Sequence, residues 1–427
     1  MQSTCNTISA ARSLAVACAL GIGLACAGCS HGSGTVTTTN TTGGNSAGNN
    51  QTGNNQSGSG TTTLTPHVSP TMPGVPTGVT GDIGAGRAYV TVLQQDKTGH
   101  ITGGTVVVLD LATDAIVTSI STLTASQYPP RYPTLNTGTK KLYFGLGDRV
   151  GIADVSKNTL LKTIKLPQQY ETVSDVAVDP TTNRVYIACG NVGASPTVAI
   201  IDGAADTILK EVPVAQGGLY IRVNPATHRV FVGAQDYTDP SDTTPCKIYE
   251  LAGDTGALIS TNAYAGVLNG IALCGATNQL AVSVSPGYSQ GGDLRILTPD
   301  KHVGRDTTRV ITLSKGYTVH GTPFTTKVDG GVSDNIYIDA QDASGKDHLL
   351  IFSTSDLSLL QDVTIPPDYF IEAGFIQAKL IGWGSWVTEI ANHTRVYENG
   401  QFIEIPEPIF SDTPQTFPVA DVKIVTQ

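Results

Sequence analysis

The sequence predicts an all-β protein, a seven-bladed β-propeller that follows a signal peptide and a disordered tether. From Asp82 onward, apolar residues come in short β-branched runs separated by Gly, Pro, Asn and Asp, with no sustained helical period. These runs recur in units of about 40–50 residues, which is typical of propeller blades. Before Asp82 the 427-residue chain has a single charged residue, Arg12, and that stretch is therefore unlike the rest.

Residues 1–28 are expected to be a lipoprotein signal peptide. The apolar run from Leu14 to Ala25 is too short to span a bilayer and is followed by small residues, as in a secretory signal. Residues 24–29 read Leu-Ala-Cys-Ala-Gly-Cys and resemble the lipobox of bacterial lipoproteins, in which the final cysteine is acylated and becomes the new N-terminus. The resemblance implies lipid attachment at Cys29. Cys26 is the second choice, and an ordinary signal peptide is the alternative.

Residues 29–81 are expected to form the tether. Ser30 to Thr63 is rich in Gly, Ser, Thr, Asn and Gln and nearly free of apolar residues, so it cannot bury enough surface to offset the entropy of ordering. Some thirty residues of this kind have a typical reach of roughly 30 Å. Leu64 to Gly81 contains four prolines and is expected to be a stiffer approach to a propeller that occupies residues 82–427.

The repeat is clearest in the third unit, where four strands, a to d, are expected. They are Val173–Val178, Val185–Ala188, Thr197–Asp202 and Thr207–Val212. Asp-Pro-Thr-Thr-Asn, residues 179–183, makes the turn between strands a and b, because Pro presets φ and Asn accepts a tight bend. Residues 224–231 repeat this turn and the strand after it.

Strands b and c can be followed through all seven units. Strand b places one residue of each unit in register: Tyr89, Tyr143, Tyr186, Phe231, Ala281, Tyr337 and Ile381. Strand c is expected at Val106–Asp110, Val150–Asp154, Val198–Asp202, Ile248–Leu251, Leu294–Thr298, Leu349–Ser353 and Arg395–Glu398. Four short strands in each of seven units predict seven blades.

The C-terminus is expected to close the ring. Val419–Val425 matches strand a of the third unit, whereas the first unit lacks a convincing strand a of its own. We therefore expect the C-terminal strand to form the innermost strand of the first blade, which would remove an open seam. Deletion of residues 417–427 would then lower the melting temperature.

The units resemble the YVTN-type repeats of bacterial and archaeal seven-bladed propellers. The namesake tetrapeptide reads Tyr89-Val90-Thr91-Val92 in the first unit, and residues 179–186 are close to the repeat consensus. The resemblance implies a fold rather than an activity. Members include surface-layer and cell-envelope proteins, and similar propellers include lactonases and electron-transfer enzymes.

The b–c and d–a connections of a propeller open on one face, where a binding surface is expected. Insertions gather in the b–c connections, at 94–104, 190–196, 235–245, 285–292 and 341–347. The d–a connections carry six tyrosines that could surround the channel mouth and bind sugars, peptides or proteins: Tyr128, Tyr132, Tyr170, Tyr264, Tyr317 and Tyr369. The alternative is that each tyrosine holds its own loop between blades.

No metal or cofactor is expected. Asp110, Asp154 and Asp202 end three c strands, where a carboxylate accepts backbone N–H bonds in the following turn. A calcium site at Asp236, Asp239 and Asp242 is the weak alternative, because the spacing lacks the order of a known calcium loop. The histidines are scattered, and His320 is the one that a lactonase-like general base would require.

Three cysteines belong to the predicted propeller, Cys189, Cys246 and Cys274. Buried free thiols are expected, and Cys189–Cys246 is the one disulfide that the geometry would allow. The net charge of −10, without a basic patch, argues against nucleic acid and against an anionic membrane surface as partners.

The function expected from these features is that of a cell-envelope lipoprotein, periplasmic or on the cell surface. The membrane would hold it through the lipid anchor, and its propeller would act as a binding or scaffold module for a protein, peptide or glycan. The alternatives are a lactonase-like hydrolase or lyase with a site at the channel mouth, and a structural protein that packs laterally in the envelope.

Overall fold

A computed structural model describes the part of the chain that carries the repeats. The described residues are 72–82, 84–95, 101–110, 113, 115–122, 128–167, 172–190, 197–214, 217–235, 245–274, 277–286, 292–299, 306–312, 317–319, 335–353, 356–364, 369–372, 375–378, 386–390, 393–398, 401–404 and 421–426. The chain divides into two compact units, Met1–Pro66 and His67–Gln427. All described residues lie in the second unit, so the expected signal peptide and Cys29 lie outside them.

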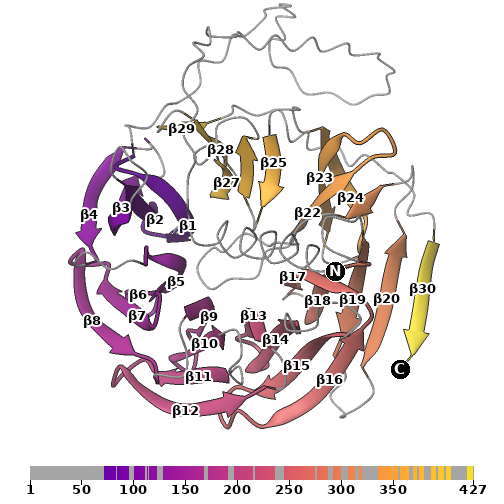
Figure 1. Ribbon diagram of the computed structural model, residues 1–427, viewed down its shortest axis with the longest axis horizontal. Coiled ribbons are helices and arrows are strands. Elements are labelled where there is room, and N and C mark those ends of the chain that lie inside the picture. The colour runs from indigo at the N-terminus through magenta and orange to yellow at the C-terminus, as the bar shows by residue number, and fades with distance from the viewer. Residues whose placement is uncertain are drawn as a thin grey trace, which may run out of the picture. The chain divides into compact units, whose positions relative to one another are not determined.

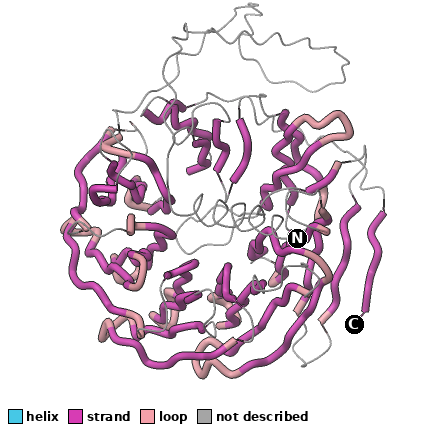
Figure 2. Tube along the Cα trace, in the orientation of Figure 1, coloured by secondary structure: helices cyan, strands magenta, loops and turns pink. Residues whose placement is uncertain are grey.

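The described residues are all β (Figure 2) and contain no helix, which confirms the predicted fold class. The strands of the first four sheets are β1 (Val75–Asp82), β2 (Arg87–Gln95), β3 (Ile101–Asp110), β4 (Ile116–Ser121), β5 (Arg131–Asn136), β6 (Lys141–Leu146), β7 (Arg149–Asp154), β8 (Thr159–Lys165), β9 (Thr172–Asp179), β10 (Arg184–Gly190), β11 (Thr197–Asp202), β12 (Thr207–Pro213), β13 (Gly217–Asn224), β14 (Arg229–Gln235), β15 (Cys246–Ala252) and β16 (Leu258–Tyr264).

The remaining strands complete three further sheets. They are β17 (Val267–Cys274), β18 (Gln279–Ser285), β19 (Asp293–Thr298), β20 (Thr307–Thr312), β21 (Thr318–Val319), β22 (Asn335–Gln341), β23 (Asp347–Ser353), β24 (Leu359–Thr364), β25 (Tyr369–Glu372), β26 (Phe375–Ala378), β27 (Trp386–Ile390), β28 (His393–Glu398), β29 (Gln401–Glu404) and β30 (Asp421–Thr426).

Neighbouring strands are antiparallel, and each sheet is built from consecutive strands of the chain, except that β30 joins β20. Five sheets have four strands, and we name each sheet by its first strand: β1–β4, β5–β8, β9–β12, β13–β16 and β21–β24. The β17 sheet has β30 as a fifth strand, and the β25 sheet also has five. Because this last sheet departs from the four-strand pattern, the count of seven blades stays a prediction.

The predicted strand register is confirmed in the described strands. Tyr89, Tyr143, Tyr186 and Phe231 are buried at equivalent places in β2, β6, β10 and β14, each in the second strand of its sheet. Ala281 and Tyr337 fall in the second strands β18 and β22, while Ile381 lies outside the described residues. The predicted c strands of the first six units lie within the third strands β3, β7, β11, β15, β19 and β23, but that of the seventh unit lies within β28, the fourth strand of its sheet.

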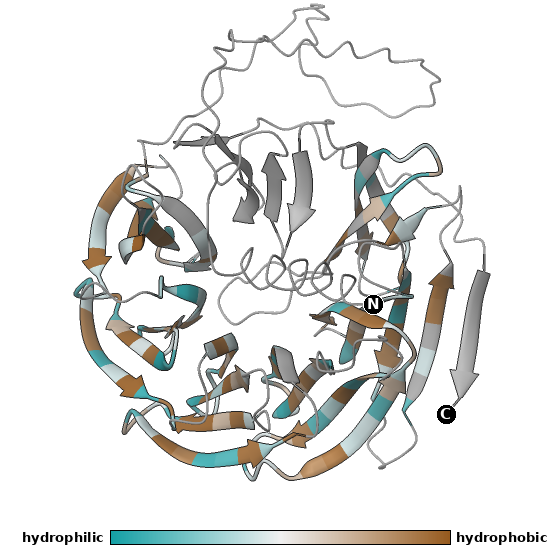
Figure 3. Ribbon diagram, viewed as in Figure 1, coloured by the Kyte–Doolittle hydropathy of each residue, from teal (hydrophilic) through white to brown (hydrophobic). Residues whose placement is uncertain are grey.

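Consecutive sheets pack face to face through apolar cores. Val176 and Val178 of β9 share one cluster with Val150 and Ile152 of β7, so the β5 and β9 sheets enclose a common core. Similar clusters join the β1 and β5 sheets, the β9 and β13 sheets, the β13 and β17 sheets, and the β17 and β21 sheets. Middle strands such as β10 and β11 are buried on both faces, which explains their continuous apolar sequence. The outer strands instead alternate between apolar and polar residues (Figure 3).

First strands lie next to one another at the centre of this unit, and fourth strands lie at its outside (Figure 1). Hydrogen bonds join the central strands of neighbouring sheets. Thr134 of β5 donates through its hydroxyl to the carbonyl of Val176 in β9 (2.8 Å). Asp175 of β9 pairs with Arg222 of β13, and Tyr220 of β13 donates to the Asn269 carbonyl of β17 (2.6 Å). The centre is therefore held by bonds that cross from sheet to sheet.

The start of the folded region and the place of the C-terminal strand both differ from the sequence prediction. The innermost place in the β1 sheet belongs to β1, which begins at Val75, seven residues before the predicted boundary. A register shift between Pro76 and Gly78 accommodates the proline, which cannot donate a backbone hydrogen bond. The C-terminal strand β30 pairs with β20 instead of β2. The prediction that the C-terminal strand forms the innermost strand of the first blade is therefore wrong.

Candidate functional site on the loop face

Antiparallel order gives every sheet two ends with different connections. The connections from first to second and from third to fourth strands leave one end, which we call the turn face. The connections from second to third strands, and from each sheet to the next, leave the other end, which we call the loop face.

In five sheets the turn face is closed by short turns that bond to their neighbours, whereas residues 320–334 join the first strand to the second in the β21 sheet. In the β1, β5, β9, β13 and β17 sheets, four residues join the first strand to the second, at 83–86, 137–140, 180–183, 225–228 and 275–278. The last residue of the described turns at Lys140, Asn183, His228 and Asn278 has a positive φ of 52–56°. Asn183 thus accepts the tight bend, as predicted from the Asp-Pro-Thr-Thr-Asn sequence.

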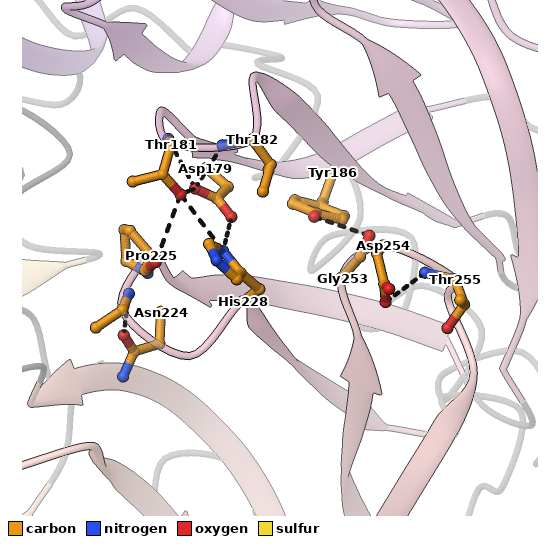
Figure 4. Close-up of polar contacts among 11 residues, drawn as sticks. Asp179, Thr181, Thr182, Tyr186, Asn224, Pro225, His228, Gly253, Asp254 and Thr255 are labelled. Atoms are coloured by element: carbon orange, nitrogen blue, oxygen red, sulfur yellow. Dashed lines mark hydrogen bonds and ion pairs between the residues drawn. The ribbon is translucent and has the colours of Figure 1, made fainter.

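Asp179 shows how such a turn is held (Figure 4). Its Oδ1 accepts bonds from the Thr181 backbone N–H (2.9 Å) and hydroxyl (2.6 Å), and its Oδ2 lies 2.8 Å from His228 Nδ1 in the next sheet. Burial acts to raise the pKa of this carboxyl, but the bonds from Thr181, His228 and Thr182 outweigh it and lower the pKa. Tyr186 donates to the Gly253 carbonyl of that same neighbouring sheet (2.9 Å).

The aspartates that end third strands are turn caps, as predicted. Asp154 Oδ1 accepts from the backbone N–H groups of Ser156 (2.9 Å) and Lys157 (3.2 Å), and Asp202 Oδ1 does the same for Ala204 and Ala205. The backbone N–H of Thr113 bonds to Asp110 (3.1 Å). Asp236, Asp239 and Asp242 lie outside the described residues. Among the residues that are described, no group of three or more potential ligands is placed to hold a metal ion.

The loop face has connections of very different lengths. Second and third strands are joined by only residues 147–148 in the β5 sheet, but by residues 236–245 in the β13 sheet. The insertion predicted at 94–104 instead extends β2 and β3 as a paired hairpin, with Gln94 opposite Gly103. The connection at 342–346 is a turn in which the backbone N–H of Gly345 bonds to the Asp342 carbonyl (2.9 Å).

Each described tyrosine of the predicted ring contacts residues that lie next to it in the fold. Tyr128 packs over Gly147, where a Cβ atom would come within 2.4 Å of its ring. Tyr132, at φ 55°, packs against the core between the β5 and β9 sheets. Tyr264 is only 3% exposed, because it lies within β16 and not in a connection. Its hydroxyl lies 3.1 Å from Thr308 Oγ1, and burial raises the pKa of Tyr264 to about 12.

Tyr128 and Tyr132 thus contact residues near their own connection, whereas Tyr264 is a strand residue, and a binding role for the tyrosines stays a prediction. Tyr170 and His320 lie outside the described residues, and Tyr369 is described only as part of strand β25. His320 follows β21, so it belongs to the connection between first and second strands and not to the one that carries Tyr317.

A polar cluster at the loop end of the β21 sheet brings together Tyr317, His348, Asp362 and Asp342. The Tyr317 hydroxyl donates to Asp362 Oδ2 (2.6 Å), and the other oxygen, Oδ1, lies 2.6 Å from His348 Nδ1. The Tyr317 and His348 rings meet edge to face with centroids 5.0 Å apart. His348 Nε2 faces Asp342 Oδ2 at 3.4 Å. Sequence reasoning missed His348 and Asp362, because nothing local indicates that Tyr317 would meet a carboxylate 45 residues away.

The cluster holds a connection in place. Asp342 Oδ1 accepts bonds from the Ser344 N–H and hydroxyl and from the Lys346 N–H, and these bonds, the hydroxyl's first, hold the pKa of Asp342 far below its usual range. Burial first, and then the nearby Asp362, raise the pKa of Tyr317. His348 is 7% exposed, and its buried Nε2 lies 3.4 Å from Asp342 Oδ2 without forming a hydrogen bond. This imidazole therefore packs against the turn at 342–346, and a substrate cannot reach it in this conformation.

Cys189, Cys246 and Cys274 are buried free thiols, as expected. Burial raises the pKa of Cys189 to about 12 and that of Cys246 to about 11, so both remain protonated and unreactive at neutral pH. No helix in the described part of the chain is long and apolar enough to cross a membrane.

No protein-family model and no curated protein matches the sequence. Among solved structures, the chain is similar to hydrazine synthase from Kuenenia stuttgartiensis, with a TM-score of 0.52 and 12% identity over 81% of this chain and 98% of that one. It is also similar to the β-propeller domain of Cps50 (Swd1) from Myceliophteria thermophila, with a TM-score of 0.50 and 11% identity over 77% of this chain and 96% of that domain.

The chain is a β-propeller. It is also similar to a chain of the mitotic checkpoint complex, with a TM-score of 0.50 and 11% identity over 74% of this chain and 83% of that one. At these identities the likeness shows the fold alone. What this propeller does must therefore be argued from its own two faces.

Proposed function

We propose that this protein is an exported, lipid-anchored β-propeller that binds another protein through its loop face. The observation that carries the proposal is the contrast between the faces. In the β1, β5, β9, β13 and β17 sheets the turn face uses short, repeated turns that bond to one another, as in Figure 4, whereas residues 320–334 make a longer connection in the β21 sheet. The loop face combines rigidly held groups, such as the Tyr317–His348–Asp362 cluster, with connections of unequal length. Loops on a rigid scaffold are where binding residues concentrate.

Other features are in keeping with a binding role. Of the solved structures named above, one belongs to a multi-protein complex. The units resemble YVTN-type repeats, and proteins with such repeats include cell-envelope proteins. The lipobox-like residues 24–29 would hold this propeller at a membrane. A net charge of −10 favours a partner with a basic or neutral surface.

The binding face can be tested by shortening one connection. Ala234 of β14 lies opposite Lys247 of β15, so an Asn-Gly turn in place of residues 236–245 can close the hairpin. We expect the wild-type protein to capture a partner from envelope extract and the shortened variant to lose it. Lys157→Ala, an exposed residue of the turn face, is the control that should retain the partner. Equal recovery by the wild type and the shortened variant would remove the loop face from consideration.

The anchor is tested separately. Cys29→Ser should move the protein from the membrane fraction to the soluble fraction and abolish incorporation of labelled palmitate, because a lipid-modified cysteine holds a chain by burial of its acyl groups. Cys26→Ser is the matched control and should leave both measurements unchanged. Labelling that survives at Cys29→Ser and is lost at Cys26→Ser would move the attachment point to Cys26.

A further inference from the structure

The outer edges of the blades differ in one respect that decides whether they can accept another strand. The fourth strands β4, β8, β12, β16 and β24 each carry a register shift against the third strand of their sheet. In β12, for example, Lys210 lies opposite Ile200 and Ile208 lies opposite Ile201, so Leu209 between them has no opposite residue. A bulge of this kind twists a strand and spoils its free edge for further pairing.

Three of the bulged residues are apolar and exposed, and on a regular edge such residues would favour pairing with another chain. Val117, Leu161 and Leu209 are 48%, 46% and 50% exposed, and they occupy the same place in β4, β8 and β12. In β8 and β12 a lysine follows at once, Lys162 or Lys210. A bulge and a lysine are both devices that keep an edge strand from pairing with another chain.

The edge of β20 lacks this protection. Thr307–Thr312 pairs with β19 over five consecutive residues without a register shift. The sequence of β20, Thr-Thr-Arg-Val-Ile-Thr, is rich in β-branched residues and contains no lysine. The short strand β29 is also regular, but it has only four residues. Among the described fourth strands, β20 is the regular edge that is long enough to hold a fifth strand.

A strand does lie on this edge. β30 pairs with β20 in antiparallel register from Thr307 opposite Thr426 to Thr312 opposite Asp421 (Figure 1). Chain order would bring the C-terminus to the β25 or β1 sheet, yet β30 passes the β21 sheet and joins the β17 sheet. The C-terminal strand therefore pairs with a regular edge, although chain order would bring it to another sheet.

We propose that the outer edge of β20 is a strand-accepting interaction site and that its partner is the C-terminal strand, Asp421–Thr426, of a second copy of this chain. Reciprocal exchange gives each copy the same six residue pairs that β30 makes in this structure. Sixteen residues, 405–420, separate β29 from β30. Such a segment can span about 50 Å when extended, which is enough to reach a neighbouring molecule. This proposal does not depend on the ligand of the loop face.

Cysteine pairing tests both the edge and the donor. Val310 lies opposite Lys423, and opposite residues of an antiparallel pair are close enough for a disulfide. The test uses full-length chains in which the four leader cysteines are replaced by serine: Cys5, Cys18, Cys26 and Cys29. One chain carries Val310→Cys and another carries Lys423→Cys. After the two are mixed and mildly oxidised, we expect a disulfide-linked dimer of unlike chains.

The matched control replaces Val310→Cys by Leu209→Cys, which places an exposed cysteine on a bulged edge and should give no dimer with Lys423→Cys. A chain with both Val310→Cys and Lys423→Cys that forms only an internal disulfide, while the mixture stays monomeric, would overturn the second copy as partner. If neither arrangement forms a disulfide although all variants show wild-type melting curves, β20 does not accept this strand and the site itself is refuted.

Discussion

Glu250 is a buried carboxyl that pairs with an arginine and shares a hydroxyl group with a second carboxyl. The residue is 2% exposed. One oxygen accepts a bond from Arg229 (2.8 Å), and the other lies 2.9 Å from the Ser260 hydroxyl. The same hydroxyl lies 2.8 Å from Asp306 of the next sheet. Because a hydroxyl has a single hydrogen, it can donate to only one of these two carboxyls, and the second contact needs a proton on a carboxyl. Burial, the largest cause, raises the pKa of Glu250, although the bonds from Ser260 and Arg229 act in the opposite direction.

Glu250→Gln should therefore change how stability depends on pH. A carboxyl with a raised pKa in the folded state contributes stability below its unfolded value of 4.5 and loses that contribution as the pH rises through the folded value. We expect the variant to gain on the wild type by about 1 kcal/mol in free energy of unfolding between pH 4 and pH 8. Urea denaturation at several pH values measures this difference.

Glu211→Gln, on the outer strand β12, is the matched control for removal of one negative charge. A difference between Glu250→Gln and the wild type that is the same at every pH would contradict the raised pKa of Glu250.

Within the turns, one interaction recurs from sheet to sheet. The last residue of a first strand bonds to the residue of positive φ in the next sheet's turn: Asp82 to Lys140 (3.0 Å), Asn136 to Asn183 (2.9 Å), Asp179 to His228 (2.8 Å) and Asn224 to Asn278. The residue types differ while the geometry stays the same. Each turn is thereby tied to the sheet before it, which explains why these turns keep the same length.

His228 offers a direct test of this link. His228→Ala removes the partner of the fully buried Asp179 carboxylate and leaves Ala at a φ of 52°, so we expect a loss of about 1–3 kcal/mol in free energy of unfolding. His228→Asn should stay within about 0.5 kcal/mol of the wild type, because Asn occupies the equivalent turn positions 183 and 278. Urea denaturation at pH 7 separates the two. A similar loss in both variants would show that the imidazole itself is needed.

At the scale of the whole propeller, the first strand β1 and the last strand β30 have different structural roles. β1 occupies the innermost place of its sheet and contacts both β5 and β27, so it joins the beginning of the ring to its end. β30 adds only to the outside of the β17 sheet. The strand that closes the centre therefore comes from residues before the predicted boundary at Asp82.

Truncation distinguishes these roles. A chain that begins at residue 83 should lose more than about 5 °C in melting temperature, because removal of β1 opens the core of the β1 sheet to water. A chain that ends at residue 420 should melt close to the wild type. Thermal unfolding followed by circular dichroism measures both. The reverse order of sensitivity would restore the C-terminal latch that the sequence favoured.

Local chemistry explains what could be predicted. The alternation of short apolar runs with Pro, Asn and Asp turns depends on a few adjacent residues, so strands such as β9 to β12 and the caps at Asp154 and Asp202 follow from sequence. Strand β1 could not be predicted from sequence, because its proline and glycines suggest a linker. Only the pairing with β2 through a bulge makes it a strand.

By itself, the sequence determined the repeat, the β class and the turn positions, since each is written in neighbouring residues. Tertiary structure alone decided which distant groups meet. Tyr264 lies in the core. His348 of β23, Asp362 of β24 and Tyr317, which precedes β21, come together at one end of their sheet. It also decided which blade edge can take another strand, because a bulge is a property of two paired strands and is invisible in either one.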